Sequence, residues 1–365
     1  MVAPQQSGPR ILDNPTVSVA LCTHNGAEFI AAQVRSIIDQ TSPVDEIVLG
    51  DDDSTDETVE IVERVLEGTP VRLRVRRHSP ALRVRGNFSD AIGATTGDVV
   101  ILCDQDDVWH PRKVETLVAA IAQGNDLVHS DARLVDASGD PLGTTLLGSL
   151  GVSQWEKRQL SGGDAVAVLL RRNLVTGATT ALNGQFARAV MPVPEGWIHD
   201  EWMAMLAALR GRLRLLPVQL TDYRQHDNNE IGVNKGGLKG RMARLLVSDV
   251  DDDVRRLRRA YTLESAVADA QWISADNAQR VREFRKHQVF RAQLPKSRVL
   301  RLPRILAECV RGRYSRYSRG WLTVARDLLQ VHGLDRRQRL DAIMEDYARQ
   351  DPTGTSQAPL RHSPS

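Results

Sequence analysis

Two short apolar runs of this chain each end in a cluster of aspartates, and this pattern restricts the possible folds more than any other feature. After EIVLG come Asp51, Asp52 and Asp53, and after DVVILC come Asp104, Asp106 and Asp107. A short apolar run bounded by polar residues is typical of a buried strand. Because ligands of an open parallel sheet bind outside the carboxyl ends of its strands, both clusters are expected to face one crevice.

The segments around these runs alternate between strand and helix patterns. Strands are predicted at Val17–Cys22, Glu46–Gly50, Val71–Arg76 and Val99–Cys103, and helices at 28–40, 57–67 and 86–95. This alternation indicates right-handed βαβ units. The predicted fold class is therefore α/β, with a Rossmann-like, mostly parallel sheet flanked by helices.

Further elements are expected along the chain. Ser54 and Glu57 have capping-box spacing, which predicts a helix start directly after the first cluster. The remaining expectations are a helix from Pro111 to Gly124, a strand at Asp126–Asp131, a long Gly-, Ser- and Thr-rich loop at 137–163, a helix at 199–210, and strands at Leu213–Leu216 and Gln219–Tyr223.

The composition changes along the chain and predicts four parts. Residues 1–15 are expected to be a flexible N-terminus, and residues 16–235 the main α/β domain, with a Gly-rich linker at 232–240. Residues 236–350 are expected to be an Arg-rich helical C-terminal extension. The tail from 351 to 365 has little apolar content and is expected to be disordered.

Overall composition excludes several classes of protein. The 365 residues are 41% hydrophobic, enough for a sizeable core. No stretch approaches the roughly 18 apolar residues of a spanning helix, and the first fifteen residues lack an apolar region, so neither export nor membrane insertion is expected. The three cysteines, Cys22, Cys103 and Cys309, have no zinc-finger or disulfide spacing. Buried free thiols and a reducing, cytoplasmic compartment are expected.

Positive charge is concentrated in one segment. Residues 282–319 hold twelve Lys or Arg against Glu283 and Glu308, a net charge of +10 in a chain whose total is +2. Such a segment could bind an anionic surface, and peripheral contact with the inner face of the cell membrane is one expectation. A solvated helical face and an oligomer contact are the alternatives.

The aspartate clusters suggest metal chemistry. Crowded carboxylates repel one another unless a cation or hydrogen-bond donors compensate. Asp104 and Asp106 flank one residue, a spacing suited to Mg²⁺ or Mn²⁺ held together with substrate phosphates. An EF-hand loop with Glu115 at its twelfth position is excluded, because its sixth position is Trp109 instead of glycine. The remaining alternative is a solvated turn.

Known nucleotide-binding motifs are missing from the sequence. No Gly-x-Gly-x-x-Gly follows a predicted strand, and no Gly-x-x-x-x-Gly-Lys-Ser/Thr occurs. A nucleotide would therefore be bound by groups other than a glycine-rich phosphate loop. A carboxylate such as Asp52 could accept a hydrogen bond from a base, while a metal neutralises the phosphates.

Five motifs in order resemble a known family. The segments VSVALCTHNG, EIVLGDDDSTDET, GNFSDAIGATTGDVVILCDQDDVW, WIHDEW and YRQHDNN resemble family 2 glycosyltransferases of the GT-A fold, and in particular their rhamnosyltransferase-like bacterial members. The resemblance covers about residues 16–232. It implies that the α/β domain is a GT-A catalytic domain and that the C-terminal helices are an extension of it.

The resemblance also implies roles for particular residues. The nucleotide sugar would be bound by Thr23, His24, Asn25, Asp51, Asp52, Asp104 and Arg224, with Asp52 reading the base. The metal would be bound by Asp106 directly, with Asp104 and His226. The catalytic base would be Asp200. The acceptor side would be formed by Asn173, Thr176, Gly177 and Glu201.

Some of these residues also have plainer explanations. Without the resemblance, acidic residues such as Asp200 before WMAMLAALR would suit the helix dipole alone. Trp109 and Trp202 are expected to be structural walls of the crevice. Asp53 stands where the family usually has glycine, which affects the conformation of the loop. The Gln-x-x-Arg-Trp motif of processive synthases does not occur, which favours transfer of single sugars.

The expected function is that of an inverting, metal-dependent glycosyltransferase in cell-surface polysaccharide synthesis. The donor would be a dTDP- or UDP-linked sugar, with rhamnose favoured, and the acceptor a saccharide or a lipid-linked saccharide. The nearest enzymatic alternative is a sugar-phosphate nucleotidyltransferase, but LCTHNGAEF lacks the basic, Gly-rich triphosphate loop that it would need. The other alternative is a basic nucleic-acid-binding or scaffold protein. No nucleic-acid partner is expected for the glycosyltransferase.

Overall fold

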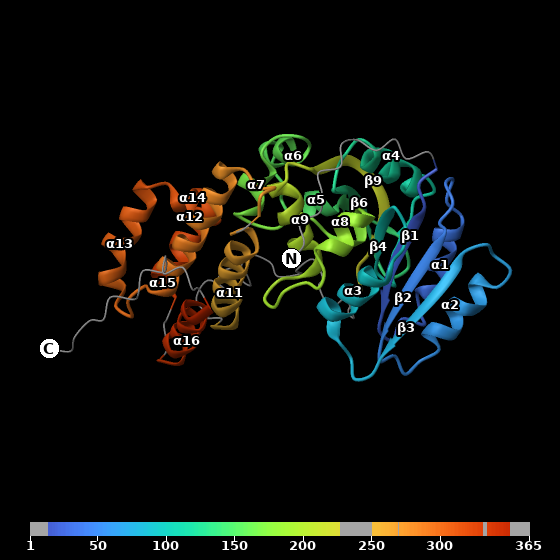
Figure 1. The fold of residues 1–365 in the computed structure, drawn as a ribbon, viewed down its shortest axis with the longest axis horizontal. Coiled ribbons are helices and arrows are strands. Elements are labelled where there is room, and N and C mark those ends of the chain that lie inside the picture. Colours follow the sequence, from blue (N-terminus) through green and yellow to red (C-terminus); the bar gives the residue numbers. More distant parts are fainter. Residues whose placement is uncertain (1–13, 227–249, 269, 331–333, 351–365) are drawn as a thin grey trace. The chain divides into compact units, whose positions relative to one another are not determined.

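The computed structural model describes residues 14–226, 250–268, 270–330 and 334–350 (Figure 1). The chain forms two compact units, one of Met1–Lys235 with Ala270–Ser274, and one of Gly236–Asp269 with Ala275–Ser365. Nearly all of the expected flexible N-terminus, the predicted linker and the C-terminal tail lie outside the described residues.

The first unit begins with the predicted alternation of strands and helices. Its elements are β1 (Val17–Thr23), α1 (Ile30–Ile38), β2 (Glu46–Asp52), α2 (Thr58–Leu66), β3 (Arg72–His78), α3 (Arg83–Ala94), β4 (Val99–Cys103), β5 (Val108–Trp109), α4 (Lys113–Ala122), β6 (Leu127–Val135), β7 (Pro141–Thr145), α5 (Leu146–Ser149), α6 (Gln154–Leu160), α7 (Ala165–Leu169), the 3-10 turn η1 (Gly177–Thr179), β8 (Thr180–Asn183), α8 (Gly184–Ala189), α9 (His199–Leu209) and β9 (Leu213–Arg224).

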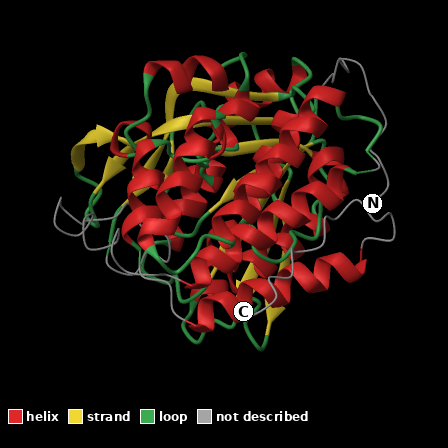
Figure 2. Ribbon diagram, turned by 90° about the vertical axis from the view of Figure 1, so that its left-hand side faces the viewer, coloured by secondary structure: helices red, strands yellow, loops and turns green. Residues whose placement is uncertain are grey.

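All strands of this unit belong to one sheet with the order β3-β2-β1-β4-β8-β6-β9-β5, and β7 pairs with β6. Strands β3, β2, β1 and β4 are parallel, β8 is antiparallel to both of its neighbours, and β6 and β9 are parallel. The predicted α/β class, with helices around the sheet, is confirmed (Figure 2). The second half of the sheet is mixed.

The position of β1 between β2 and β4 sets the location of the two carboxylate clusters. Thr23 at the end of β1 is in register with Asp51 of β2, and Leu21 is in register with Cys103 of β4. Because the three strands are parallel, their carboxyl ends meet at the same edge of the sheet. The predicted crevice edge is therefore formed by the loops after β1, β2 and β4.

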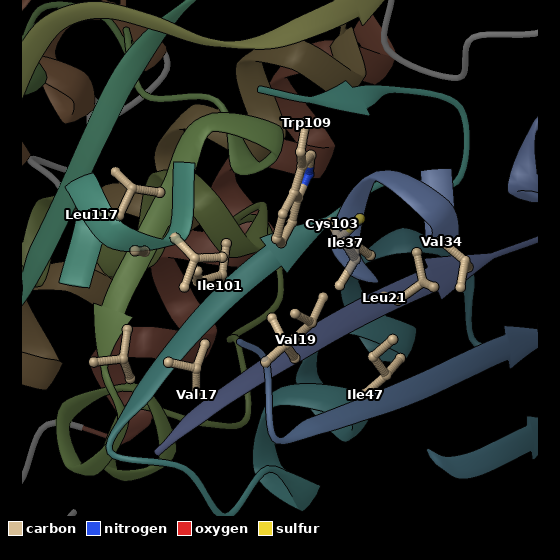
Figure 3. Packing of buried hydrophobic residues seen from close by; sticks show 14 of the residues in the cluster. Val17, Val19, Leu21, Val34, Ile37, Ile47, Ile101, Cys103, Trp109 and Leu117 are labelled. Atoms are coloured by element: carbon tan, nitrogen blue, oxygen red, sulfur yellow. The ribbon is translucent and has the colours of Figure 1, made fainter. Parts of the chain in front are cut away.

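A hydrophobic cluster fixes these strands from one face (Figure 3). Alternate strand residues pack against α1, α2 and α4, while α3 contacts β1 and β2. The cluster includes Val17, Val19, Leu21, Ile47, Ile101 and Cys103 from the strands, Val34 and Ile37 from α1, Leu117 from α4, and Trp109. Strands covered on both faces are apolar at every position, which explains the continuous apolar runs in the sequence.

Three local predictions are wrong. Ser54 does not cap α2, because its Oγ accepts a hydrogen bond from Asn25 N, and the residue before the helix is Glu57. The predicted loop at 137–163 contains β7, α5 and α6, and a capping box between Ser153 and Glu156 begins α6. The two strands predicted before Arg224 form the single strand β9, in which the pairing with β6 shifts register after Leu216.

The second unit is helical, as predicted for this part of the chain. Its elements are α11 (Val250–Val267), α12 (Ala275–Ala292), α13 (Arg298–Val310), α14 (Arg313–Tyr317), α15 (Trp321–Leu329) and α16 (Leu334–Gln350). Buried ion pairs join these helices, including Arg291 with Asp327 at 2.8 Å and Arg336 with Asp253 at 2.6 Å. Among the helices of the described residues, none is long and apolar enough to cross a membrane.

Candidate functional site

The first cluster, after β2, is held by neutral donors. Thr23 Oγ1 donates to Asp51 Oδ1 at 3.0 Å, and Asp51 is almost completely buried. Asp52 Oδ1 accepts from the backbone N–H of Leu82 at 2.6 Å, and His24 Nδ1 lies 2.6 Å from the Asp52 carbonyl oxygen. Asp51 therefore supports the loop after β1, whereas Asp52 is positioned at the crevice.

The third aspartate of this cluster has a left-handed backbone. The φ angle of Asp53 is +66°, a region in which Asp is one of the few residues other than glycine that occur repeatedly. The loop therefore adopts the conformation that glycine would favour at this position, although the residue is aspartate.

A glutamine side chain joins the loop after β1 to the loop after β4. Gln105 Oε1 accepts from His24 N at 2.8 Å, and Gln105 Nε2 donates to His24 O at 3.1 Å. Gly26 makes room for this side chain, because a Cβ at that position would lie 2.4 Å from Gln105 Oε1. Asn25, with a φ of +48°, accepts from Thr55 N and so fixes the same loop to the segment after β2.

The second cluster is held by residues at the end of β9. His226 Nε2 lies 2.9 Å from Asp106 Oδ2, and the imidazole stacks on Phe29 with 4.8 Å between ring centroids. Arg224 donates from Nε to the Asp106 carbonyl oxygen at 2.8 Å and from its backbone N to Asp107 Oδ1 at 3.0 Å. The motif that begins YRQH thus contacts the loop of Asp104 and Asp106 directly. His226 is the last residue of this motif that the structure describes.

Two further charged residues of this region are Asp107, a member of the second cluster with no predicted role of its own, and Lys113, which was not predicted. Both are buried, and Lys113 Nζ donates to Ala178 O at 2.7 Å and to Thr221 Oγ1 at 2.9 Å. Burial, and then the charges of Asp106 and Asp104, raise the pKa of Asp107 well above its usual value. Burial lowers the pKa of Lys113 to about 8, although the neighbouring acidic groups oppose that shift.

Asp200 lies in the first turn of α9 and is half-buried. Its Oδ2 accepts from Gly177 N at 3.2 Å and its Oδ1 accepts from Glu201 N at 2.6 Å. Burial, followed by the charge of Glu201, raises the pKa of Asp200 to about 7, although the two backbone hydrogen bonds oppose this shift. A carboxylate with such a pKa can accept a proton near neutral pH.

The neighbouring His199 was not predicted as a site residue. Its ring stacks on Phe88 with 3.8 Å between centroids, and burial lowers its pKa to about 3, so the imidazole is neutral. Neither ring nitrogen has a hydrogen-bond partner among the described residues. A Cβ on Gly177 would lie 2.7 Å from His199 Nε2, so glycine allows the segment before η1 to approach α9 closely.

These residues surround a cavity of about 550 Å³. The predicted site residues that line it are Thr23, His24, Asp52, Asp104, Asp106, Asn173, Thr176, Gly177, Asp200 and Glu201. The other four, Asn25, Asp51, Arg224 and His226, do not line it and instead hold the loops that do. The cavity therefore brings together the residues predicted for base reading, metal binding, proton transfer and the acceptor.

Other lining residues were not predicted. Arg83, at the start of α3, lines the cavity with a φ of +60°, and Phe88, Gln105 and Tyr223 also line it. The predicted placement of Trp109 and Trp202 in the crevice wall is wrong, because both are buried in the core and neither lines the cavity. The Trp202 ring N–H donates to Val190 O at 3.0 Å, which requires an interior position.

The donor set of the second cluster fits a divalent cation that is held partly by a substrate. Asp106 and His226 would offer an oxygen and a nitrogen ligand, and one oxygen of buried Asp107 has no hydrogen-bond partner among the described residues. Within those residues no three His, Cys, Asp or Glu side chains form a complete metal site. Mg²⁺ is commonly bound by one or two carboxylates, with water and phosphate oxygens completing its shell.

Comparison with known proteins gives matches to glycosyltransferases. Residues 18–173 match the family described as glycosyl transferase family 2. Uncharacterized glycosyltransferase alr2836 of a Nostoc strain is 31% identical over 116 residues, which are 31% of this chain and 34% of that protein. The dTDP-rhamnosyl transferase RfbG of Shigella flexneri is 25% identical over 227 residues, which are 59% of this chain and 74% of that protein.

Among solved structures, S. aureus TarS in complex with UDP-GlcNAc aligns with 91% of this chain and 92% of its own, at 15% identity and a TM-score of 0.48. The matches to the first curated relatives span only 34%, 44% and 38% of their lengths. Residues 18–173, the segment that matches glycosyl transferase family 2, contain both carboxylate clusters and the loops that join them.

Proposed function

We propose that this protein is an inverting, metal-dependent glycosyltransferase that moves a sugar from a nucleotide-diphosphate sugar to a saccharide or lipid-linked acceptor. The observation that carries the proposal is the cavity itself. A half-buried carboxylate with a pKa of about 7, Asp200, lines the same space as Asp52, Asp104 and Asp106.

Asp200 is the proposed catalytic base. Its oxygens accept hydrogen bonds from two backbone N–H groups, which fix the orientation of the carboxylate. It would remove the proton from an acceptor hydroxyl as that oxygen attacks the anomeric carbon. The bond from that carbon to the diphosphate breaks in the same step, which inverts the configuration. Asn173, Thr176, Gly177 and Glu201 are the proposed acceptor side of the cavity.

Asp106, with Asp104 and His226, is the proposed holder of Mg²⁺ or Mn²⁺. When bound, the ion would supply positive charge to the departing diphosphate. The 2.9 Å contact between His226 and Asp106 fixes the direction of the carboxylate. Arg224 holds the backbone of this loop, so its proposed role is to position the diphosphate site.

The donor is proposed to be a dTDP- or UDP-linked sugar. Asp52, with the loop of Thr23 and His24, would bind the nucleoside, because its carboxylate lies at the cavity and can accept from a base N–H. Rhamnose is the favoured sugar, a choice supported by the motif resemblance and by the relative RfbG. The proposed setting is cell-surface polysaccharide synthesis at the cytoplasmic face of the membrane, with residues 16–235 catalytic and residues 236–350 as the extension.

The test is the substitution Asp200→Asn, with Asp140→Asn, at an exposed carboxylate outside the cavity, as the matched control. Transfer is expected to fall about 10²–10⁴-fold, while donor and metal affinity stay near wild type. Release of nucleoside diphosphate from dTDP- and UDP-sugars with Mn²⁺ measures the rate, and release of pyrophosphate would instead indicate a nucleotidyltransferase. Retained turnover in Asp200→Asn would remove this residue from the mechanism.

The pH dependence provides a second readout. A carboxyl group whose pKa is raised on folding destabilises the folded state above its unfolded pKa, by roughly 1.4 kcal/mol per pKa unit. For Asp200 this cost grows between about pH 4 and pH 7. The melting temperature of Asp200→Asn, relative to wild type, is therefore expected to rise across that interval. A difference independent of pH would contradict the raised pKa.

A further inference from the structure

Large apolar side chains are exposed mainly on two helices of the second unit. Of the twelve large hydrophobic residues that are exposed among the described residues, eight lie on α13 and α15. They are Val299, Leu300, Leu302, Leu306 and Val310 on α13, and Trp321, Leu322 and Leu329 on α15. We call these eight side chains the outer apolar surface.

Four of the five exposed apolar residues of α13 form one stripe along the helix. Positions 299, 302, 306 and 310 recur at helical spacing, so their side chains share a face. The opposite face is directed inward and carries Arg301, Ile305 and Glu308, all buried. The helix is therefore oriented with two charged residues inside and its apolar stripe outside, and Val310 at the end of the stripe is 89% exposed.

Hydrogen bonds fix this orientation. The Arg301 guanidinium donates to Asp327 O at 2.9 Å and to Gln330 O at 2.6 Å, both at the end of α15. Arg298 Nη2 donates to Leu329 O at 2.8 Å. Rotation of α13 to bury its stripe would break these bonds and leave buried Arg301 without its carbonyl partners, so α13 and α15 form one rigid surface.

Exposed cations lie in the same stretch of chain as the outer apolar surface, with Lys296 before α13, Arg304 on α13 and Arg316 on α14. Lys296, Arg304 and Arg316 are exposed, and within the described part of the chain they form no ion pair. Other cations between 282 and 319 form ion pairs within the second unit, as in the pairs of Arg291 with Asp327 and Arg313 with Glu308. The +10 charge is thus not spread evenly over the surface. Its exposed cations Lys296, Arg304 and Arg316 lie in the same stretch of chain as the apolar stripe.

We propose that the outer apolar surface docks the protein on a membrane that contains anionic lipid, with the stripe of α13 and Trp321 entering the headgroup region. An apolar helical face bordered by Lys or Arg is the pattern of helices that lie in the plane of a bilayer surface. Trp321 is 78% exposed, and tryptophan is enriched at membrane interfaces. Anionic headgroups complement the exposed cations.

The same charges disfavour a second copy of the chain as the occupant. A symmetric contact between α13 and α14 of two copies would bring the exposed Arg304 and Arg316 of both copies into one interface. An anionic lipid surface neutralises these groups instead. Membrane attachment is separate from the proposed sugar transfer, so the vesicle experiment can contradict the docking while the transfer activity is retained.

The experiment uses the full chain and vesicles of stated composition. Cosedimentation with phosphatidylglycerol-containing vesicles is expected, with much weaker binding to phosphatidylcholine vesicles and a further decrease at high salt. The variant Leu306→Ser/Val310→Ser/Trp321→Ser removes exposed apolar groups only, and it is expected to lose about 10-fold or more in vesicle affinity. The matched control Leu142→Ser/Val218→Ser changes exposed apolar residues of the first unit and is expected to bind like wild type.

A variant of the charged residues tests the role of the cations separately from that of the apolar side chains. Arg304→Glu/Arg316→Glu is expected to lose the preference for anionic vesicles, whereas the exposed Arg64→Glu is not. Sedimentation equilibrium of wild type and the apolar variant is measured in parallel. Equal binding of wild type to neutral and anionic vesicles would overturn the proposal. So would unchanged binding of the apolar variant, or a wild-type dimer that this variant makes monomeric.

Discussion

The two carboxylate clusters occupy equivalent positions at the ends of β2 and β4, but their surroundings differ. After β2, Asp51 accepts from Thr23 Oγ1 and Asp52 accepts from Leu82 N, so neutral donors bind these carboxylates. After β4, Asp107 is buried with a strongly raised pKa beside Asp104 and Asp106. A buried lysine, Lys113, opposes part of this charge.

The comparison teaches that an aspartate cluster does not by itself indicate a metal site. The first cluster is balanced by hydrogen bonds within the protein and is suited to receive a donor group of a ligand. In the second cluster, burial and the charges of Asp106 and Asp104 raise the pKa of Asp107, and a bound cation would oppose this effect. Four substitutions, ordered from the largest expected effect to the smallest, test whether this difference is real.

Asp106→Ala should abolish the increase in UDP or dTDP affinity that Mn²⁺ produces, together with turnover, because the remaining side chains cannot supply the same coordination. Calorimetric titration with and without Mn²⁺ measures this effect. Asp140→Ala, a surface carboxylate of the same unit, is the control and should titrate like wild type. If Asp106→Ala kept the full increase in nucleotide affinity with Mn²⁺, the second cluster would not be the metal site that distinguishes it from the first.

Lys113→Met should destabilise the protein by about 1–3 kcal/mol, because buried Ala178 O and Thr221 Oγ1 lose their hydrogen-bond donor and Asp107 loses a nearby positive charge. The first cluster has no equivalent dependence on a buried cation. Urea denaturation of the metal-free protein gives the free energy of unfolding. The control Lys157→Met, a surface lysine of α6, should change it by less than about 0.5 kcal/mol. Equal stabilities of the two variants would show that Lys113 does not compensate the second cluster.

Asp52→Ala should weaken nucleotide binding by about 1–3 kcal/mol through loss of a charged hydrogen-bond acceptor. The loss should be the same with and without Mn²⁺, in contrast to Asp106→Ala. The same titrations measure it. A loss that occurs only in the presence of metal would assign both clusters to a single metal site.

Asp53→Gly should have the smallest effect, within about 1 kcal/mol of wild type, because glycine adopts a φ of +66° without strain but makes the unfolded chain more flexible. Asp53→Ala should be less stable than Asp53→Gly. Thermal unfolding compares the two variants. The opposite order would mean that the backbone at this position is not left-handed in solution.

Much of the first half of the sheet could be predicted from the sequence. Strands β1, β2 and β4 are covered on both faces, so their apolar residues are consecutive and easily recognised. The position of the clusters followed from the strand ends. The capping box at Ser54 failed because its hydroxyl accepts from Asn25, a residue 29 positions earlier, and such tertiary competition leaves no local sequence signal.

The missed features depend on which face of a helix is covered. Lys113 begins an ordinary amphipathic helix, and only the packing of α4 near Ala178 and Thr221 buries its amine. In α13 the periodicity predicts an apolar inner face, but Arg301 and Glu308 are inside and the apolar stripe is outside. Hydrophobic periodicity defines the faces of a helix without stating which of them meets the core.

The double hydrogen bond between Gln105 and His24 has a consequence for how this protein can evolve. Gln105 is accommodated only because position 26 is glycine, since a Cβ there would lie 2.4 Å from the amide oxygen. Residues 26 and 105 are 79 positions apart in the chain, yet a larger residue at one requires a different side chain at the other. Covariation between these two positions among related sequences is the expected trace of this contact.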